Sequence, residues 1–137
     1  MSVLMKIHHI GIATNELAAA ADIWGDLLGL QPDHIEEVAG QKVRVCMLPI
    51  GESRLELLEA TSADSPVAKF LEKRGGGIHH IAVSVEDIRS ALQDLKTKGA
   101  RLIDEEPRVG AGGCLVAFIH PSSTAGVLLE LVEEPRP

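Results

Sequence analysis

Apolar and polar positions alternate near the start of the chain and then recur at helical spacing. Residues 6–13 alternate as in a β-strand, whereas apolar residues after Asn15 recur every three or four positions as far as Gly29. Because polar residues often cap the start of a helix and glycine often ends one, this pattern predicts a strand followed by a helix. Three further strands are predicted at 35–39, 42–50 and 53–60. The first half is therefore expected to fold as βαβββ.

The same order of patterns returns after a glycine-rich joint. Residues 64–66 (Asp-Ser-Pro) predict a short helix that ends near Arg74, and three glycines at 75–77 then interrupt the pattern. A strand is expected over 80–85, followed by a helix with one apolar face over 86–98. Further strands are predicted near 101–105, 114–120 and 126–133. These elements make a second βαβββ module.

The repeat predicts an α+β fold made of two tandem βαβββ modules. We place module 1 at about 6–60, the connecting helix and glycine-rich joint at 61–77, and module 2 at about 78–133. The chain has 137 residues and is 45% hydrophobic, which suffices for one domain with a shared interior. A single domain over residues 1–137 is expected.

Each module opens with a histidine and closes with a glutamate at nearly the same separation. The first pair is His9 and Glu56, and the second is His80 and Glu130. The repetition indicates that the two modules meet around one divalent metal ion. Two imidazoles and two carboxylates suit Co²⁺, Mn²⁺, Ni²⁺ or Zn²⁺ better than an ion that selects thiolates or only oxygen ligands.

Both histidine strands begin with a His-His pair, and the alternation of side chains distinguishes the two members. His9 shares its strand face with small residues, whereas His8 shares its face with isoleucines. In the second module His80 likewise lies with small residues, and His79 lies with bulky ones. We expect the bulky faces to pack under the helices, so that the small-residue faces line a concave cavity into which His9 and His80 point.

Leucines flank both glutamates, and a carboxylate buried between apolar neighbours is costly unless it is paired or binds a metal. Taken alone, each histidine or glutamate is also compatible with a structural role. The four together, in register across the repeat, favour the metal site. In an octahedral ion, four protein ligands leave two positions for a bidentate substrate, which favours Lewis-acid stabilisation of an enolate. A non-haem iron oxygenase would use fewer protein ligands.

Composition narrows the possible partners and the compartment. The formal net charge of −7 and the presence of only three aromatic residues argue against nucleic-acid binding. Two cysteines, Cys46 and Cys114, are too few for a disulfide scaffold and are expected to be buried thiols. The chain shows no signal peptide and no apolar run of about 18 residues, so a soluble cytoplasmic protein without membrane contact is expected.

Several short stretches between Ile7 and Val132 carry the pattern of a known family. They are residues 9–13, 56–59, 64–71, 76–81, 118–121 and 126–131. Through them the chain resembles the vicinal oxygen chelate superfamily and, within it, the methylmalonyl-CoA epimerase family. The metal-binding pattern alone is shared with glyoxalase I, whereas the Asp-Ser-Pro segment, the glycine-flanked His-His pair and the Phe-Ile-His-Pro run are more similar to the epimerases.

The resemblance implies a cupped mixed sheet, usually in a homodimer, with a divalent ion, often cobalt, as cofactor. It implies that His9, Glu56, His80 and Glu130 are the metal ligands. The implied substrate is an acyl-CoA, and the implied reaction interconverts the 2R and 2S forms of methylmalonyl-CoA by proton abstraction at C2 through an enolate thioester. Glu130 matches a metal-binding glutamate that is proposed to act as one of the bases in this family.

Inversion of a carbon centre needs proton exchange on both of its faces, and the second acid or base is not identified by the sequence. Some family members carry a glutamate where this chain has Val45, which cannot transfer a proton. Glu37, Glu59, His120 and a metal-bound water remain as alternatives. Ser122 and Ser123 stand where many relatives have a lysine, so the residues that bind CoA also stay open.

Two other functions compete with the epimerase. A lactoylglutathione lyase of the glyoxalase I type would isomerise a glutathione hemithioacetal through a similar enediolate, and it would need cations for the glutathione carboxylates. A non-catalytic small-molecule-binding protein of the same fold often lacks the metal ligands. Since all four ligand positions are filled here, the sequence favours an enzyme over a binding protein.

Overall fold

The computed structural model describes residues 3–137, which form two compact units. We name them after the histidines that they contain. The His9 unit consists of His9–His79, and the His80 unit consists of His80–Pro137 together with the described residues that precede His9. Strands β1 (Leu4–Ala13) and β5 (Gly77–Val85) each pass from one unit to the other.

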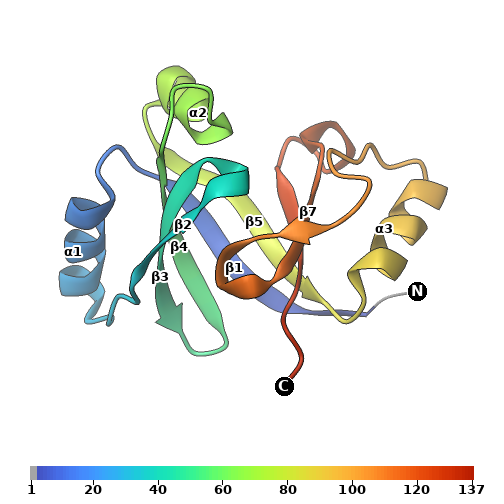
Figure 1. Ribbon diagram of the computed structural model, residues 1–137, viewed down its shortest axis with the longest axis horizontal. Helices are drawn as coiled ribbons and strands as arrows, with labels where there is room; N and C mark the ends of the chain where they lie inside the picture. Colours follow the sequence, from blue (N-terminus) through green and yellow to red (C-terminus); the bar gives the residue numbers. More distant parts are fainter. Residues whose placement is uncertain (1–2) are drawn as a thin grey trace. The chain divides into compact units, whose positions relative to one another are not determined.

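The His9 unit contains a mixed sheet in the order β2-β3-β4-β1 and two α-helices (Figure 1). Strand β1 runs parallel to β4, whereas the pairs β2–β3 and β3–β4 are antiparallel. After β1 the elements are α1 (Leu17–Leu28), β2 (Ile35–Val38), a 3-10 turn (Ala39–Gln41), β3 (Val43–Ile50), β4 (Ser53–Ala60) and α2 (Pro66–Arg74). Each predicted element of this half is present within about two residues of its expected bounds.

Helix α1 packs its apolar face on β3 and β4 (Figure 1). The buried residues of this core are Leu17, Ala21, Cys46, Leu48 and Leu57. The helix ends at Gly29, whose φ of 66° lies in the left-handed region that favours glycine. The helical spacing read from the sequence is thus the spacing that buries this face.

Helix α2 begins at the predicted Asp-Ser-Pro segment. The hydroxyl of Ser65, which is fully buried, accepts a hydrogen bond from the backbone N–H of Val67 at 3.2 Å. Pro66 occupies the first helical position, where its missing N–H costs nothing. Gly75 ends the helix with a φ of 76°. Local capping therefore sets both ends of this short helix.

The His80 unit repeats this plan with its strands in the order β5-β8-β7-β6. Strand β5 runs parallel to β8, whereas β8, β7 and β6 pair in antiparallel fashion. After β5 the elements are α3 (Ile88–Thr97), β6 (Arg108–Val109), a 3-10 turn (Ala111–Gly113), β7 (Leu115–Ile119), a second 3-10 turn (Pro121–Ser123) and β8 (Leu129–Glu133). The second βαβββ module is therefore confirmed as an order of elements.

Helix α3 covers the apolar face of this second sheet and begins at a capped position (Figure 1). Asp87 accepts a hydrogen bond from the N–H of Ser90 at 3.2 Å. The buried core beneath the helix consists of Val85, Ile88, Ala91, Leu92, Ala117, Ile119 and Leu131. As in the first module, one helix seals one sheet face.

The prediction of a strand near 101–105 is wrong. This segment forms an isolated bridge between Leu102 and Ile119 and a few backbone hydrogen bonds, among them those from Ile103 and Asp104 to Phe118, but no continuous strand. The short strand β6 lies further on at Arg108–Val109. The carboxylate of Asp104 accepts a hydrogen bond from the N–H of Phe118 at 2.9 Å. A side chain therefore satisfies a backbone group of β7 that a full ladder would otherwise pair.

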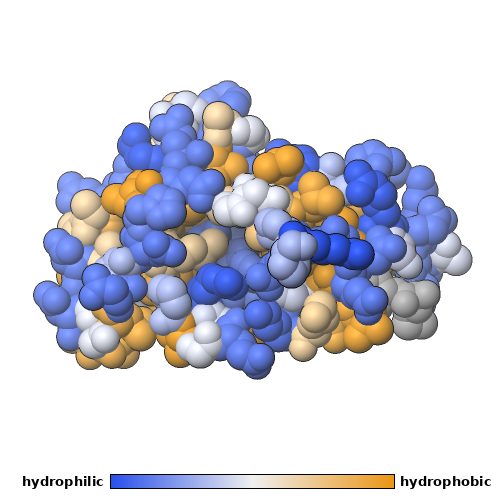
Figure 2. Space-filling model, turned by 60° about the horizontal axis from the view of Figure 1, so that its bottom comes forward, coloured by the Kyte–Doolittle hydropathy of each residue, from blue (hydrophilic) through white to orange (hydrophobic). Residues whose placement is uncertain are grey.

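The surface mixes apolar and hydrophilic side chains. On the face drawn in Figure 2, apolar residues are interspersed with hydrophilic ones. Several apolar side chains of β1 are exposed, with Leu4 at 66% and Met5 at 65% of their full accessible area. Within residues 3–137, no helix has the length and apolar character needed to cross a membrane.

Candidate metal centre

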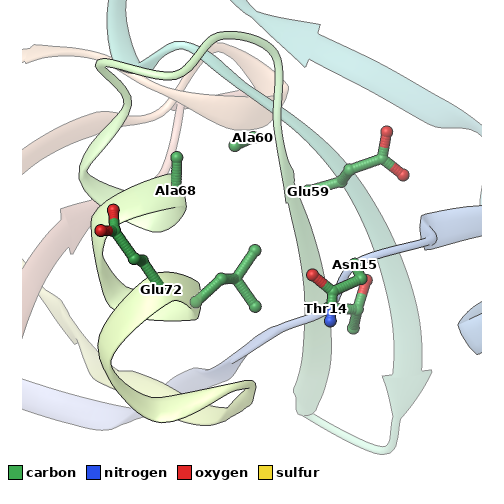
Figure 3. Close-up of a pocket in the computed structure, with 7 residues that line it drawn as sticks. Thr14, Asn15, Glu59, Ala60, Ala68 and Glu72 are labelled. Atoms are coloured by element: carbon green, nitrogen blue, oxygen red, sulfur yellow. The ribbon is translucent and has the colours of Figure 1, made fainter.

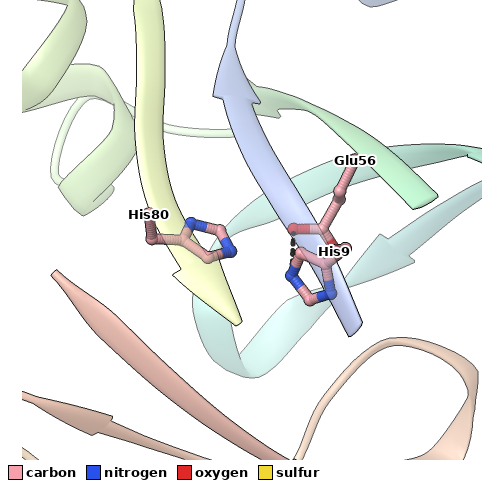
Figure 4. A group of neighbouring side chains, drawn as sticks. All are labelled: His9, Glu56 and His80. Atoms are coloured by element: carbon pink, nitrogen blue, oxygen red, sulfur yellow. Dashed lines mark ion pairs between the residues drawn. The ribbon is translucent and has the colours of Figure 1, made fainter. Parts of the chain in front are cut away.

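His9 and Glu56 meet within the His9 unit. The parallel pairing of β1 and β4 places Gly11 beside Glu56 and so puts His9 and Glu56 on the same sheet face. His9 Nε2 lies 3.3 Å from Glu56 Oε1, and the two residues are only 3% and 5% exposed (Figure 4). A buried imidazole and a buried carboxylate thus face one another.

His80 and Glu130 form the equivalent pair in the His80 unit. Ala82 on β5 pairs with Glu130 on β8, so His80 and Glu130 also share a face. His80 Nε2 lies 3.0 Å from Glu130 Oε1, and both residues are less than 5% exposed. The ring of Phe118 packs edge-on against the His80 ring with centroids 5.6 Å apart, which fixes the imidazole laterally.

The expected division of strand faces is confirmed within each unit. In β1, Ile12 packs against the core under α1, whereas His9 and Gly11 lie on the opposite face with Glu56. In β5, Val83 packs against the core under α3. We name the two sheet faces that do not carry helices the His9 face and the His80 face. Each contains one histidine and one glutamate of the predicted set.

These side chains have the chemistry of a transition-metal site. His9, Glu56 and His80 each offer one ligand atom of a type that can hold a metal ion. Imidazole nitrogens with carboxylate oxygens suit Co²⁺, Mn²⁺, Ni²⁺ and Zn²⁺. Burial adds to the argument, because a carboxylate withdrawn from water needs a cation or several hydrogen-bond donors. The residues present therefore fit a divalent ion.

Glu59, one of the candidate second bases, has a different role in the structure. Its carboxylate accepts hydrogen bonds from Arg44 at 2.8 Å and from the N–H of Leu17, the first residue of α1, at 2.6 Å. The hydrogen bond from Arg44, followed by the one from Leu17, holds the pKa of Glu59 below its ordinary value. Glu59 lies three residues after Glu56 and therefore faces α1 rather than the His9 face.

The other side-chain candidates also lie away from the two faces or are engaged elsewhere. Glu37 is exposed, and its pairing with Arg44 places it on the α1 side of the sheet. His120 Nδ1 accepts a hydrogen bond from the N–H of Ser122 at 3.0 Å. Val45 is 2% exposed and lies on the His9 face between β2 and β4. None of the carboxylates named from sequence as second bases shares a face with Glu56.

A cleft opens where β1 and β4 end beside α2 (Figure 3). Its lining consists of Thr14, Asn15, Glu59, Ala60, Ala68, Leu71 and Glu72. Ala60 extends the His9 face, because it follows Glu56 at an even spacing along β4. The cleft lies at the carboxyl ends of two parallel strands in the His9 unit.

Both cysteines are free and buried, as expected from the sequence. Burial raises the pKa of the Cys46 thiol, and its Sγ donates a hydrogen bond to the carbonyl oxygen of Asp33 at 3.3 Å. Cys114 packs with Ala82, Val116 and Val132 on the His80 face. Both thiols therefore act as apolar packing groups.

Comparison with known proteins identifies the family. The profile of the Glyoxalase/Bleomycin resistance protein/Dioxygenase superfamily matches residues 8–118. The chain belongs to this superfamily. The match spans His9 and His80 and agrees with the paired modules described above, so the predicted glyoxalase-like fold is confirmed.

Relatives within the superfamily include several epimerases. Human mitochondrial methylmalonyl-CoA epimerase is 39% identical over 129 residues, covering 93% of this chain and 73% of its own. The ethylmalonyl-CoA/methylmalonyl-CoA epimerase of Cereibacter sphaeroides is 39% identical over 92% of this chain and 96% of its own. A solved structure of methylmalonyl-CoA epimerase in complex with methylmalonyl-CoA and NH4+ has a TM-score of 0.93 at 40% identity, covering 96% of both chains.

The competing lyase is a more distant relative. The lactoylglutathione lyase of Escherichia coli O157:H7 is 23% identical over 130 residues. The higher identity to the epimerases agrees with the resemblance found in the sequence. The Asp-Ser-Pro segment, the glycine-flanked His-His pair and the Phe-Ile-His-Pro run therefore distinguished the epimerases from glyoxalase I, which the shared metal pattern could not do.

Proposed function

We propose that this protein is a methylmalonyl-CoA epimerase, which interconverts the 2R and 2S forms of its substrate by proton transfer at C2. The observation that carries this proposal is the repeated buried His–Glu pair, found once in each unit on the face without a helix. Epimerases of about 40% identity over nearly the whole chain support the choice of substrate class. The lyase, at 23% identity, has less support.

His9, Glu56, His80 and Glu130 are proposed to hold the divalent ion together. A bound ion would supply Lewis acidity that stabilises negative charge on the thioester oxygen of the substrate. Their burial excludes bulk water from the ligands and strengthens electrostatic interactions there. We propose Co²⁺ first, with Mn²⁺, Ni²⁺ and Zn²⁺ as alternatives, because all four ions accept this donor set.

Glu130 is the proposed base for one face of C2. Its strand places it beside Ala82, a residue too small to block a substrate, and beside Phe118 on β7. A carboxylate has two oxygens, so one oxygen can serve as a ligand while the other takes the proton. Removing the C2 proton needs a base within hydrogen-bond reach of that proton.

The remaining proposals concern the domain organisation, oligomeric state and localisation of the protein. We propose that the two units act as one domain in a cytoplasmic homodimer. The exposed apolar side chains of Leu4, Met5 and Ile7 on β1 support an interface between copies, since burial of apolar surface drives association. Sedimentation analysis would test the dimer, with a dimeric mass as the expected result.

Substrate preference tests the proposed function. Protein loaded with Co²⁺ is incubated with (2S)-methylmalonyl-CoA, and the appearance of the 2R form is followed by a stereospecific coupled assay. A parallel reaction contains methylglyoxal and glutathione. We expect turnover of the thioester only. Turnover of the hemithioacetal alone would favour the lyase, and failure to bind or turn over either substrate would favour a binding protein with another ligand.

A further inference from the structure

Phe118 stands beside the proposed base Glu130 within the His80 unit. The register of β7 and β8 pairs the two residues directly, so their side chains project from the same sheet face. Side chains paired in this way have Cβ atoms about 5 Å apart. On its other side, Glu130 pairs with Ala82 on β5. Glu130 therefore has an aromatic neighbour on one side and only a methyl group on the other.

The Phe118 ring also reaches His80, although a strand separates the two residues. Phe118 lies on β7 and His80 on β5, and the strand between them, β8, carries Glu130. Neighbouring strands lie about 4.8 Å apart, so these two backbones are about 10 Å apart. The two ring centroids are nevertheless only 5.6 Å apart, and His80 Nε2 lies 3.0 Å from Glu130 Oε1. The two rings and the carboxylate thus form one cluster over β8.

The backbone of Phe118 is held firmly from both sides. Its N–H donates a hydrogen bond to the Asp104 carboxylate at 2.9 Å. Its carbonyl oxygen accepts hydrogen bonds from the N–H groups of Ile103 at 2.9 Å and Asp104 at 3.2 Å. Ala117 and Ile119, its neighbours on β7, are 0% and 1% exposed in the core under α3. The ring is therefore attached to a rigid support, which a wall that discriminates by size requires.

The ring also keeps accessible surface that a ligand can cover. Phe118 is half-buried, whereas His80 and Glu130 are only 3% and 4% exposed and Ala82 is fully buried. Ligand sites typically combine apolar walls with a few polar groups that fix orientation. On the His80 face, Phe118 supplies such a wall next to the polar pair.

The reaction brings the substituent at C2 close to this ring. A base removes a proton only from within hydrogen-bond reach, about 3 Å, and the alkyl substituent is bonded to the same carbon as that proton. The substituent therefore lies close to the Glu130 carboxylate during the reaction. Of the two residues that pair with Glu130, only Phe118 presents a large apolar surface. Contact with this surface removes the alkyl group from water.

We propose that Phe118 determines which acyl group the enzyme accepts, by limiting the size of the alkyl substituent at C2. The substrate class is then a CoA thioester of a 2-alkylmalonate with a short alkyl group. The ring contacts the substituent and takes no part in proton transfer. This inference rests on the proposed function, because it assumes that Glu130 acts on C2 of the same kind of substrate.

A series of substrates tests the size limit. Wild-type protein and Phe118→Leu, both loaded with Co²⁺, are incubated in D₂O with methylmalonyl-CoA, ethylmalonyl-CoA and propylmalonyl-CoA, and deuterium uptake at C2 is followed by mass spectrometry. Leucine is smaller than phenylalanine and removes part of the wall. One methylene in an apolar pocket changes kcat/KM by about 10-fold or more. We therefore expect the preference for methyl over propyl to fall by about 10-fold in Phe118→Leu.

Binding provides a second readout that needs no turnover. 2,2-Dimethylmalonyl-CoA and 2,2-diethylmalonyl-CoA have no proton at C2 and cannot react, so calorimetry measures their Kd values directly. The ratio of the diethyl to the dimethyl Kd should also fall in Phe118→Leu. Thermal unfolding and bound metal per chain report the state of the variant. If Phe118→Leu does not fold or loses metal, Phe118→Met replaces the ring by a flexible side chain and should shift both ratios in the same direction.

Phe70→Leu is the matched control. Phe70 on α2 packs edge-on against His79 with ring centroids 5.0 Å apart, so this variant loses the same kind of aromatic contact in the His9 unit. His79 projects from the opposite strand face to His80. Phe70→Leu should therefore keep the wild-type preference for methyl over propyl and the wild-type ratio of Kd values.

The outcomes separate this inference from the proposed function. An equal change of kcat/KM for all three substrates in Phe118→Leu, with an unchanged ratio of Kd values, overturns the inference, because the ring would then contact a part that the substrates share. Wild-type values throughout the series overturn it as well. In both cases the epimerase proposal stands. A wild-type protein that neither exchanges nor binds any of these thioesters contradicts the proposed function itself.

Discussion

Glu59 Oε2 accepts a hydrogen bond from the backbone N–H of Leu17 at 2.6 Å, so a residue of β4 holds the start of α1. The His80 unit repeats this relationship, because Glu133 Oε1 on β8 accepts a hydrogen bond from the N–H of Ile88 at 3.0 Å. Each of these glutamates lies three residues after a proposed metal ligand. One strand therefore presents a ligand on one face and a helix cap on the other.

Removing this cap should destabilise the fold. Glu59→Ala removes the acceptor at the start of α1 and the partner of Arg44, and it leaves a helix N–H unsatisfied. We expect the free energy of unfolding to fall by about 1–2 kcal/mol, as for other helix caps. Urea denaturation measures the change. Glu52→Ala, at an exposed turn, is the control and should differ from wild type by less than about 0.5 kcal/mol.

The contribution of the ionised Glu59 should depend on pH. Its pKa in the folded protein is lowered, chiefly by the hydrogen bond from Arg44, so folding favours the charged form. This stability is present above the pKa of the unfolded chain, about 4.3, and is lost as the pH falls through the folded pKa. The difference in unfolding free energy between wild type and Glu59→Gln should be constant from pH 7 to about 5 and shrink below about 4. A difference that grows on acidification would contradict this account.

Ser65 should matter more than its small size suggests. It is fully buried, and its hydroxyl caps α2 through the N–H of Val67. Ser65→Ala is therefore expected to lower the free energy of unfolding by about 1 kcal/mol. Ser62→Ala is the matched control, since Ser62 is exposed and bonds only the exposed carboxylate of Asp64. In thermal unfolding, Ser65→Ala should have a clearly lower melting temperature than Ser62→Ala.

Metal binding should depend on the paired residues in both units. Wild-type protein is expected to gain stability on addition of Co²⁺ or Mn²⁺, because an ion that binds only the folded state shifts the unfolding equilibrium. Glu56→Ala and His80→Ala should lose both this gain and bound metal per chain. His34→Ala, with a side chain that is 79% exposed, should retain both. Full metal occupancy in Glu56→Ala or His80→Ala would refute the ligand assignment.

Local patterns predicted most of the elements because the caps, glycines and apolar periods are encoded locally. Helix α1 and strand β4 have the predicted bounds. The prediction of a strand near 101–105 was wrong. In this segment the Asp104 side chain accepts a hydrogen bond from the backbone of β7, and such a long-range contact has no local signal in the sequence.

In the candidate site, too, local patterns predicted some features, whereas features that depend on strand pairing were not predicted. Alternation within one strand assigned His9 to a face opposite Ile12, and the structure agrees within the His9 unit. The faces of the two adjacent glutamates on β2, Glu36 and Glu37, were not predicted, because they depend on the register between β2 and β3. Adjacent glutamates at 36 and 37 point to opposite faces, and only the pairing partner distinguishes them.

The central claim is best tested by following C2 of methylmalonyl-CoA in D₂O with wild-type, Co²⁺-loaded protein. Chirality and deuterium content are measured together by a stereospecific assay and mass spectrometry. The proposed mechanism predicts that inverted molecules carry one solvent deuterium at C2 from the earliest time points, because the incoming proton comes from an acid that has exchanged with the solvent. An unchanged stereoisomer without deuterium, over times sufficient for many turnovers, would contradict it.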